Sequence, residues 1–266
     1  MGIRRYFATQ DNTITNAFKN DLRNRATGSN AGASDVLEAF VIHGQTSASV
    51  DSNNAEQARI LLQFDMNEIV DDIANGVIPS SSVDYILRMY NAPHADTTPL
   101  SYSLNVVMLD QSWNEGRGLD LEEFTDNGVC NWVSASVGSF WGADPANPAT
   151  KVTGGYFHEG PNASASYFFS GGVEDLSLNV NFAVDRWRSS GSEGNNGFIL
   201  KHTDDVIAGE HGTFFTKKFF GRNSEFYFKR PVIEARWDSS RKDNRGNFIV
   251  SSSLADGSDN LNTLFL

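Results

Sequence analysis

The chain has 266 residues, 39% of them hydrophobic, and a formal net charge of −12. A chain of this length and apolar content can bury a sizeable core within one large domain. No run of residues is apolar enough to span a membrane, and the start "MGIRRYFATQ" lacks the apolar stretch of a secretion signal. The single cysteine, Cys130, excludes an internal disulfide and the usual multi-cysteine zinc sites.

The negative charge is unevenly distributed. Residues 213–250 contain nine Lys and Arg against four Asp and Glu, which leaves 12 against 29 in the rest of the chain. An acidic body with one short basic segment argues against general nucleic-acid binding, which needs a larger basic face. The segment either contacts an acidic protein surface or forms a strand whose basic face is solvated.

Three parts follow one another along the chain. Residues 1–34 are polar and predict an N-terminal segment or arm, with a loop at 25–35. Residues 35–212 contain most of the alternating, strand-like patterns and predict the main domain. Residues 213–266 form a basic, aromatic C-terminal segment, which we expect to pack on the main domain and to provide an interface.

Within the main domain, short strands alternate with loops and two short helices. The stretch "ARILLQFDMNEIV" (58–70) passes from strand alternation to helical spacing without a glycine or proline. The runs at 83–90 and 101–109 both alternate, and the proline-containing loop between them predicts that they form an antiparallel pair. In full, the predicted strands are 36–43, 57–64, 83–90, 101–109, 175–181 and 196–202, and the predicted helices are 66–74 and 182–188.

Many short strands with few and short helices predict an all-β fold, an antiparallel jelly-roll-like β-sandwich with extended N- and C-terminal segments. Parallel βαβ winding would need more and longer helices. The apolar faces of the predicted strands should supply the core, with the following side chains buried: Leu62, Phe64, Leu87, Leu104, Val106, Phe198 and Leu200.

The best candidate for a metal site is "HTDDVIAGEH" (202–211), with His202, Asp204, Asp205, Glu210 and His211. The two histidines are nine residues apart across a glycine, unlike the one-turn spacing of zinc hydrolases. A solvated acidic loop is the main interpretation, and a structural Ca²⁺ held by Asp204 and Asp205 is the alternative. No catalytic constellation and no cofactor motif stands out, so we expect a protein that is not an enzyme and has no cofactor.

Aromatic residues in the long loops 110–160 raise the question of sugar binding, because exposed aromatic rings stack on sugar rings. The candidates are Trp113, Trp132, Trp141 and Tyr156. The alternative is that these large side chains plug the ends of the sandwich, as buried aromatics commonly do.

In the C-terminal segment, basic residues interleave with aromatic ones, a mixture typical of protein interfaces. The predicted interface residues are Lys217, Lys218, Phe219, Phe220, Arg222, Lys229 and Arg230. The partner would be a neighbouring copy of the chain or another protein with an acidic surface.

The order of these stretches resembles the DNRLRE-type β-sandwich module, which is related to carbohydrate-binding modules. The resemblance covers roughly residues 35–205 and lies in "RILLQFDMNEI", "SWNEGRG" and "DLSLNVNFAVDRWRSSGSEGNNGFILKHTDD". It implies that the turn at 65–74 plugs the sandwich, with Ile69 and Ile73 in the core and with Asp65 and Asn67 as helix caps.

The terminal segments exceed what such a module needs, and they resemble structural proteins of tailed phages from marine hosts. The resemblance implies a non-enzymatic virion protein of the head, neck or tail, made in the bacterial cytoplasm, with other virion proteins and its own copies as partners. The alternative is a carbohydrate-binding module for a host-surface or environmental polysaccharide.

Overall fold

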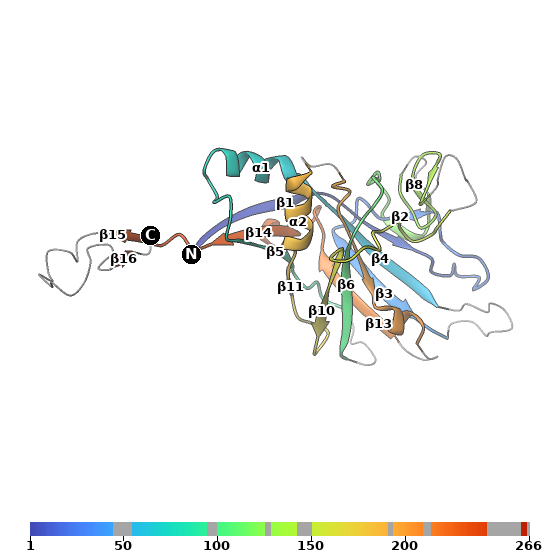
Figure 1. Ribbon diagram of the computed structural model, residues 1–266. Helices are drawn as coiled ribbons and strands as arrows, with labels where there is room; N and C mark the ends of the chain where they lie inside the picture. Colours follow the sequence, from blue (N-terminus) through green and yellow to red (C-terminus); the bar gives the residue numbers. More distant parts are fainter. Residues whose placement is uncertain are drawn as a thin grey trace, which may run out of the picture.

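A computed structural model describes residues 1–44, 55–94, 100–125, 129–142, 151–190, 194–209, 214–243 and 262–264. The described part of the chain is mostly β-structure with a few short helices (Figure 1). Its main strands are β1 (Gly2–Thr15), β3 (Val36–Ile42), β4 (Glu56–Phe64), β5 (Val83–Met89), β6 (Tyr102–Met108), β10 (Ser164–Phe169), β11 (Leu176–Asn179), β12 (Phe198–His202), β13 (Phe214–Phe220) and β14 (Val232–Trp237).

Shorter elements complete the fold. The helices are α1 (Met66–Ala74), α2 (Asn181–Ser189) and α3 (Asp204–Ile207), with the 3₁₀ turn η2 (Tyr227–Lys229). The short strands are β2 (Ser29–Asn30), β7 (Asp120–Thr125), β8 (Ser134–Ser136), β9 (Ser139–Phe140), β15 (Arg241–Asp243) and β16 (Asn262–Leu264). No helix among the described residues is long and apolar enough to cross a membrane.

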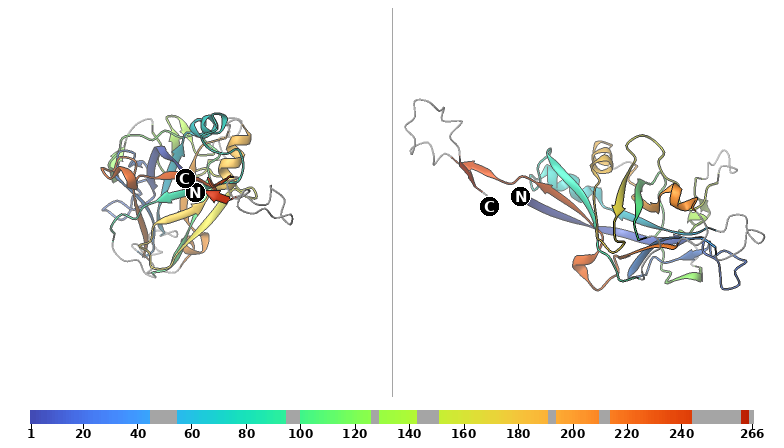
Figure 2. Two further views of the ribbon diagram at one scale, coloured as in Figure 1. Left: turned by 90° about the vertical axis from the view of Figure 1, so that its left-hand side faces the viewer. Right: turned by 90° about the horizontal axis from the view of Figure 1, so that it is seen from below.

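The main strands form one antiparallel sheet that curls into a nearly closed barrel. Its order is β10-β6-β12-β4-β1-β14-β5-β11, and the pair β3–β13 attaches through β3 to β4. The left view of Figure 2 looks along the curled sheet from the end at which the N-terminus lies. The prediction of a mostly β, antiparallel fold is therefore confirmed.

Strand β1 joins the two halves of the sheet. Its first half pairs with β14, from Gly2 to Phe7, and its second half pairs with β4, with a register irregularity between Ala8 and Gln10. A long strand that bends in this way serves both halves. The segment 1–34 therefore contributes a central strand of the sheet, and the structure differs here from the predicted arm.

The C-terminal segment is likewise part of the sheet. Strand β13 pairs with β3 along its whole length, and β14 lies between β1 and β5. Only beyond β14 does the chain leave the body, where β15 pairs with β16 at a distance from the barrel (Figure 1). The sheet thus combines strands from all three parts that the sequence analysis separated.

Side chains on both faces of the sheet are buried in two separate cores. Ile60 and Leu62 of β4 point into the barrel, whereas Leu61 between them packs against the loops after β6. This explains why the five residues of β12 are all buried. The core prediction is confirmed for every residue named: Leu62, Phe64, Leu87, Leu104, Val106, Phe198 and Leu200.

The predicted strands and both predicted helices are present, but one predicted pairing is wrong. Strand β5 pairs with β14 and β11, whereas β6 pairs with β10 and β12. Strands β5 and β6 therefore lie in different halves of the sheet and do not pair with each other. The alternation of apolar and polar residues predicted where the strands lie. It did not predict which strands pair, because the apolar face of one strand can pack beside that of any other.

Helix α1 begins directly after strand β4, and a side-chain cap marks the join. The Asp65 carboxylate accepts a hydrogen bond from the Asn67 N–H at 2.9 Å, so Asp65 is the N-cap. Asn67, which was predicted to be a second cap, is instead a first-turn residue whose N–H donates this bond, so that part of the prediction is wrong. Ile69 is buried in the core and Ile73 packs at its edge. The join between strand and helix therefore has a structural role.

Candidate functional site

The three tryptophans proposed for sugar stacking are buried. Trp113 and Trp132 are 6% exposed and Trp141 is fully buried, in the core outside the barrel. The Trp141 indole N–H donates to the Asn131 carbonyl at 2.7 Å. Of the four candidates only Tyr156 is exposed. The loops therefore use these rings to cover the sheet, and their faces are not available to a sugar.

The acidic loop after β12 does not assemble a metal site from described residues. Asp204 and Asp205 begin the short helix α3, and the Asp204 carboxylate accepts from the Lys201 ammonium at 2.8 Å. Nowhere in the described ranges do three His, Cys, Asp or Glu side chains converge to hold a metal. Glu210 and His211 lie outside these ranges. His202 is buried inside the barrel, where burial lowers its pKa to about 4.

An Asp–His pair lies on the surface near the start of β10. His158 Nδ1 is 2.9 Å from the Asp110 carboxylate, and its Nε2 is 2.9 Å from an Arg186 nitrogen. A guanidinium can only donate, so Nε2 accepts and the Nδ1–H donates to Asp110. The lone pair that a general base would use is therefore occupied by Arg186.

A second polar cluster lies between β1 and the segment after β13. The Arg222 guanidinium forms a two-pronged ion pair with the Glu115 carboxylate, with a shortest distance of 2.6 Å. The neighbouring Asp11 carboxylate accepts from the Arg222 backbone N–H. Burial raises the pKa of Asp11 to about 7. The cluster ties the loop before β7 to the sheet and opens onto none of the clefts described below.

Two of the seven residues of the predicted basic interface are buried, whereas the others are partly or fully exposed. Lys217 is fully buried, and its ammonium donates to Asn91 Oδ1 at 2.7 Å and to the carbonyls of Gly172 and Glu174 at 2.9 and 2.7 Å. Phe219 is buried beside it. These two residues, like the ion-paired Arg222, hold the fold together. Lys217 and Phe219 face inward because alternate residues of β13 point into the barrel.

The predicted surface continues beyond β13 as an aromatic knob, residues 224–230. Its three consecutive aromatic side chains are exposed: Phe226 by 49%, Tyr227 by 50% and Phe228 by 72%. Lys229 is exposed next to them. The sequence contained a signal for this: a strand buries alternate residues, so three adjacent aromatics cannot all face a core.

The knob is held rigidly. The Arg230 guanidinium donates twice to the Ser224 carbonyl, at 3.0 and 2.8 Å, which closes the loop. The Tyr227 ring packs on Phe7 of β1 with centroids 4.7 Å apart. The Lys229 ammonium lies 5.1 Å from the Phe226 ring centre, within reach of a cation–π interaction. These contacts hold the loop and the Tyr227 and Phe226 rings in place.

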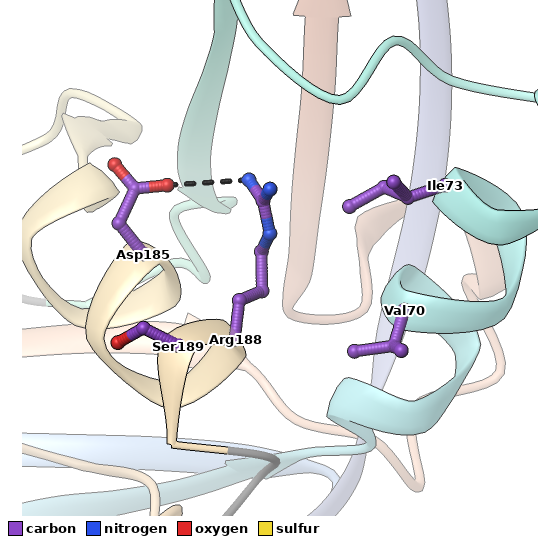
Figure 3. Close-up of a pocket in the computed structure, with 5 residues that line it drawn as sticks. All are labelled: Val70, Ile73, Asp185, Arg188 and Ser189. Carbon is purple, nitrogen blue, oxygen red and sulfur yellow. Dashed lines mark hydrogen bonds and ion pairs between the residues drawn. The ribbon is translucent and has the colours of Figure 1, made fainter.

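Elsewhere on the barrel, α1 and α2 enclose a cleft (Figure 3). Val70 and Ile73 of α1 line one side, and Asp185 and Arg188 of α2 the other, around about 300 Å³. Arg188 extends between the helices and donates to the Asp185 carboxylate at 3.3 Å and to the Ser80 carbonyl at 3.1 Å.

Neighbouring clefts extend this one across the surface. One of about 540 Å³ shares Asp185 and Arg188 and reaches Asp84 over the serine loop 80–82. Ser82 has a φ of 58°, which is unusual for a residue other than glycine. Two more clefts contain the side chain of Trp237. We call this surface the helix groove and define it by Val70, Ile73, Ser80, Asp84, Asp185, Arg188 and Trp237.

Trp237 differs from the other tryptophans. Four of the five in the chain are buried, whereas Trp237 is partly exposed at the end of β14. Its ring lies against Gly2, its partner across the strands, where an added Cβ would come within 2.3 Å of the ring. Sequence reasoning missed this groove, because its residues come from four separate segments and share no motif.

Comparisons with models of known protein families and with curated proteins find no match. The resemblance to the DNRLRE-type module and to phage structural proteins therefore stays a prediction.

Proposed function

We propose that this protein is a non-enzymatic structural protein that assembles with copies of itself, and that its place is the virion of a tailed phage. The aromatic knob is the observation that carries the assembly. The assignment to a virion depends on the resemblance of the terminal segments alone. We propose further that the sheet is a variant of the jelly-roll sandwich, an architecture that occurs in viral capsid domains.

The knob has the chemistry of a binding hot spot. Aromatic residues and arginine dominate the energetics of interfaces, whereas lysine contributes mainly charge. Burying one large apolar side chain contributes about 1.5–3 kcal/mol, and Phe228 leaves 72% of its surface in water. Because the knob is rigid, it loses little conformational freedom on binding. A surface of this kind favours a protein partner.

The pair β15–β16 supports the same function. It extends away from the barrel and pairs only with itself within the described part of the chain (Figure 1). An isolated two-stranded ribbon is at best marginally stable in water. Contact with a neighbouring molecule would stabilise it, as assembly arms are stabilised in their complexes.

Most of the residues predicted for carbohydrate binding are not accessible to a sugar. Trp113, Trp132 and Trp141 are buried, so Tyr156 alone among the candidates presents a ring to solvent. One tyrosine without a neighbouring aromatic platform is a weak basis for binding a polysaccharide. The geometry therefore favours assembly.

Sedimentation of the pure full-length protein tests this proposal. We expect concentration-dependent oligomers, and we expect Phe228→Ser to weaken association by about 30-fold, which corresponds to a hot-spot loss of about 2 kcal/mol. The matched control is Phe168→Ser, since Phe168 is 64% exposed on β10, outside the knob. Equal assembly of wild type and Phe228→Ser would contradict the proposal.

A further inference from the structure

The aromatic knob has a partner surface of matching chemistry on the same molecule. The helix groove contains apolar side chains that are partly exposed, among them Val70 at 37%. Trp237 adds an aromatic surface. The knob presents aromatic rings of its own, so contact between the two would remove apolar surface from water on both sides.

The charges of the two surfaces are also complementary. Asp84, Asp185 and Asp238 are exposed in the groove clefts. The Arg188 and Asp185 charges balance each other, and Arg236 is paired with the buried Glu234 at 2.5 Å, so the negative charge of the clefts comes from Asp84 and Asp238. Glu68 and Asp71 add exposed carboxylates on α1.

On the knob, Lys229 is exposed and the Arg230 guanidinium lies over the Tyr227 ring, beside one exposed carboxylate, Glu225. The knob therefore has a small excess of basic charge beside its aromatic rings, and the groove has an excess of acidic charge beside its apolar side chains. Such an arrangement gives specificity and register to a contact whose affinity comes from the rings.

A knob cannot reach the groove of its own molecule. Tyr227 packs on Phe7 and Trp237 on Gly2, five residues apart along β1. At about 3.3 Å per residue the two sites are about 17 Å apart along the strand. An odd separation also places Phe7 and Gly2 on opposite faces of the strand. In the right view of Figure 2 the knob, in dark orange, projects on the side away from α1.

We propose that the aromatic knob of one copy docks in the helix groove of the next, a head-to-tail contact between copies of this chain. This inference rests on the proposed assembly function and names the surface that receives the knob. A head-to-tail contact leaves one knob and one groove free in every dimer, so the assembly closes into a ring or grows as a filament.

Two blocking variants and their mixture test the inference. Phe228→Ser removes the outermost ring of the knob, and Val70→Arg places a bulky charge in the groove at an exposed position. Sedimentation of each full-length variant should give monomers at concentrations where the wild type assembles. The matched control for the groove is Val173→Arg, because Val173 is 55% exposed and lies outside both surfaces; it should assemble as the wild type does.

The mixture gives the decisive result. One intact knob and one intact groove remain in a mixture of Phe228→Ser with Val70→Arg, so it should form dimers and nothing larger. If Val70→Arg assembles like the wild type while Phe228→Ser does not, the knob binds another surface, such as a second knob, and the head-to-tail contact is wrong although the assembly function stands. A wild type that stays monomeric at every concentration overturns both.

Discussion

Lys217 offers a test of how the fold tolerates a buried charge. Its ammonium has three neutral oxygen partners and no carboxylate bonded to it, and burial lowers its pKa from 10.5 to about 8. The folded state therefore releases this proton more easily than the unfolded state. The free energy of unfolding therefore rises with pH between about 8 and 10.5. Below pH 8 Lys217 is charged in both states, and its buried charge destabilises the folded state by the full amount.

The magnitude comes from the same shift. Each pKa unit corresponds to about 1.4 kcal/mol, so titration of Lys217 alone raises the free energy of unfolding by about 2.5 kcal/mol between pH 7 and pH 10. Lys217→Met keeps the length of the side chain and removes the titration. The difference in unfolding free energy between wild type and Lys217→Met should therefore shift in favour of the wild type by about 2.5 kcal/mol over this range.

Urea unfolding at pH 7 and pH 10 measures this difference. The adjacent Lys218 is partly exposed and lies 3.5 Å from the Glu38 carboxylate, so Lys218→Met is the matched control. An ion pair at the surface contributes about 0–1 kcal/mol, so the control should change little and show no comparable pH dependence. If the difference in unfolding free energy between wild type and Lys217→Met is equal at both pH values, burial does not lower the pKa of Lys217.

Three further predictions concern the cores and the other buried ionisable groups. Leu104→Ala in the barrel core should lower the free energy of unfolding by about 2–5 kcal/mol in urea melts, and a loss below about 0.5 kcal/mol would contradict the assignment of the strand face. His202 stays neutral in the barrel, so stability should fall as the pH drops from about 6.5 towards 4. His202→Leu should reduce this acid sensitivity in thermal melts, whereas an unchanged acid profile would show that His202 is not responsible. Asp11 has a raised pKa, so the wild type should lose stability as the pH rises from about 4 to 7. Asp11→Asn should remove that loss, and a variant whose pH profile parallels the wild type would count against the burial of a charged carboxylate.

Much of the fold could be predicted from local sequence patterns. The alternation around Leu62, Leu87 and Leu104 identified strands and the face that each turns to the core. The capping aspartate Asp65 and the spacing after it identified α1. These features depend on residues close together in the chain, where period and capping chemistry leave little choice.

The neighbours of each strand could not be predicted in the same way. Strand β1 has a polar sequence, and Asp11, Asn12 and Thr13 are nevertheless buried in it. Their polar groups find partners in distant loops: the Asn12 amide donates to Cys130 Sγ at 2.7 Å, and its oxygen accepts from the Ala31 N–H. No pattern within residues 1–34 shows that such partners exist, so the segment looked like an arm.

Whether a predicted site residue is exposed also depends on contacts that are distant in the sequence. Lys217 looked like a surface residue because lysine is rarely buried, yet β13 turns it towards the carbonyls of Gly172 and Glu174. Trp141 looked available because it lies in a long loop, yet that loop covers the outer face of the sheet. The exposed rings of the knob lie within the basic, aromatic segment that the sequence did identify.

We propose that the aromatic knob is an interface, and cross-linking from position 228 is a direct test of that proposal. A photoreactive phenylalanine analogue replaces Phe228 in the full-length chain, and the same analogue replaces Phe168 in a control. Illumination and mass spectrometry of the products should give a cross-linked dimer from position 228, joined to peptides of α1 or α2, and none from position 168. Products from position 228 that are confined to single chains at every protein concentration would show that the knob is not an interface.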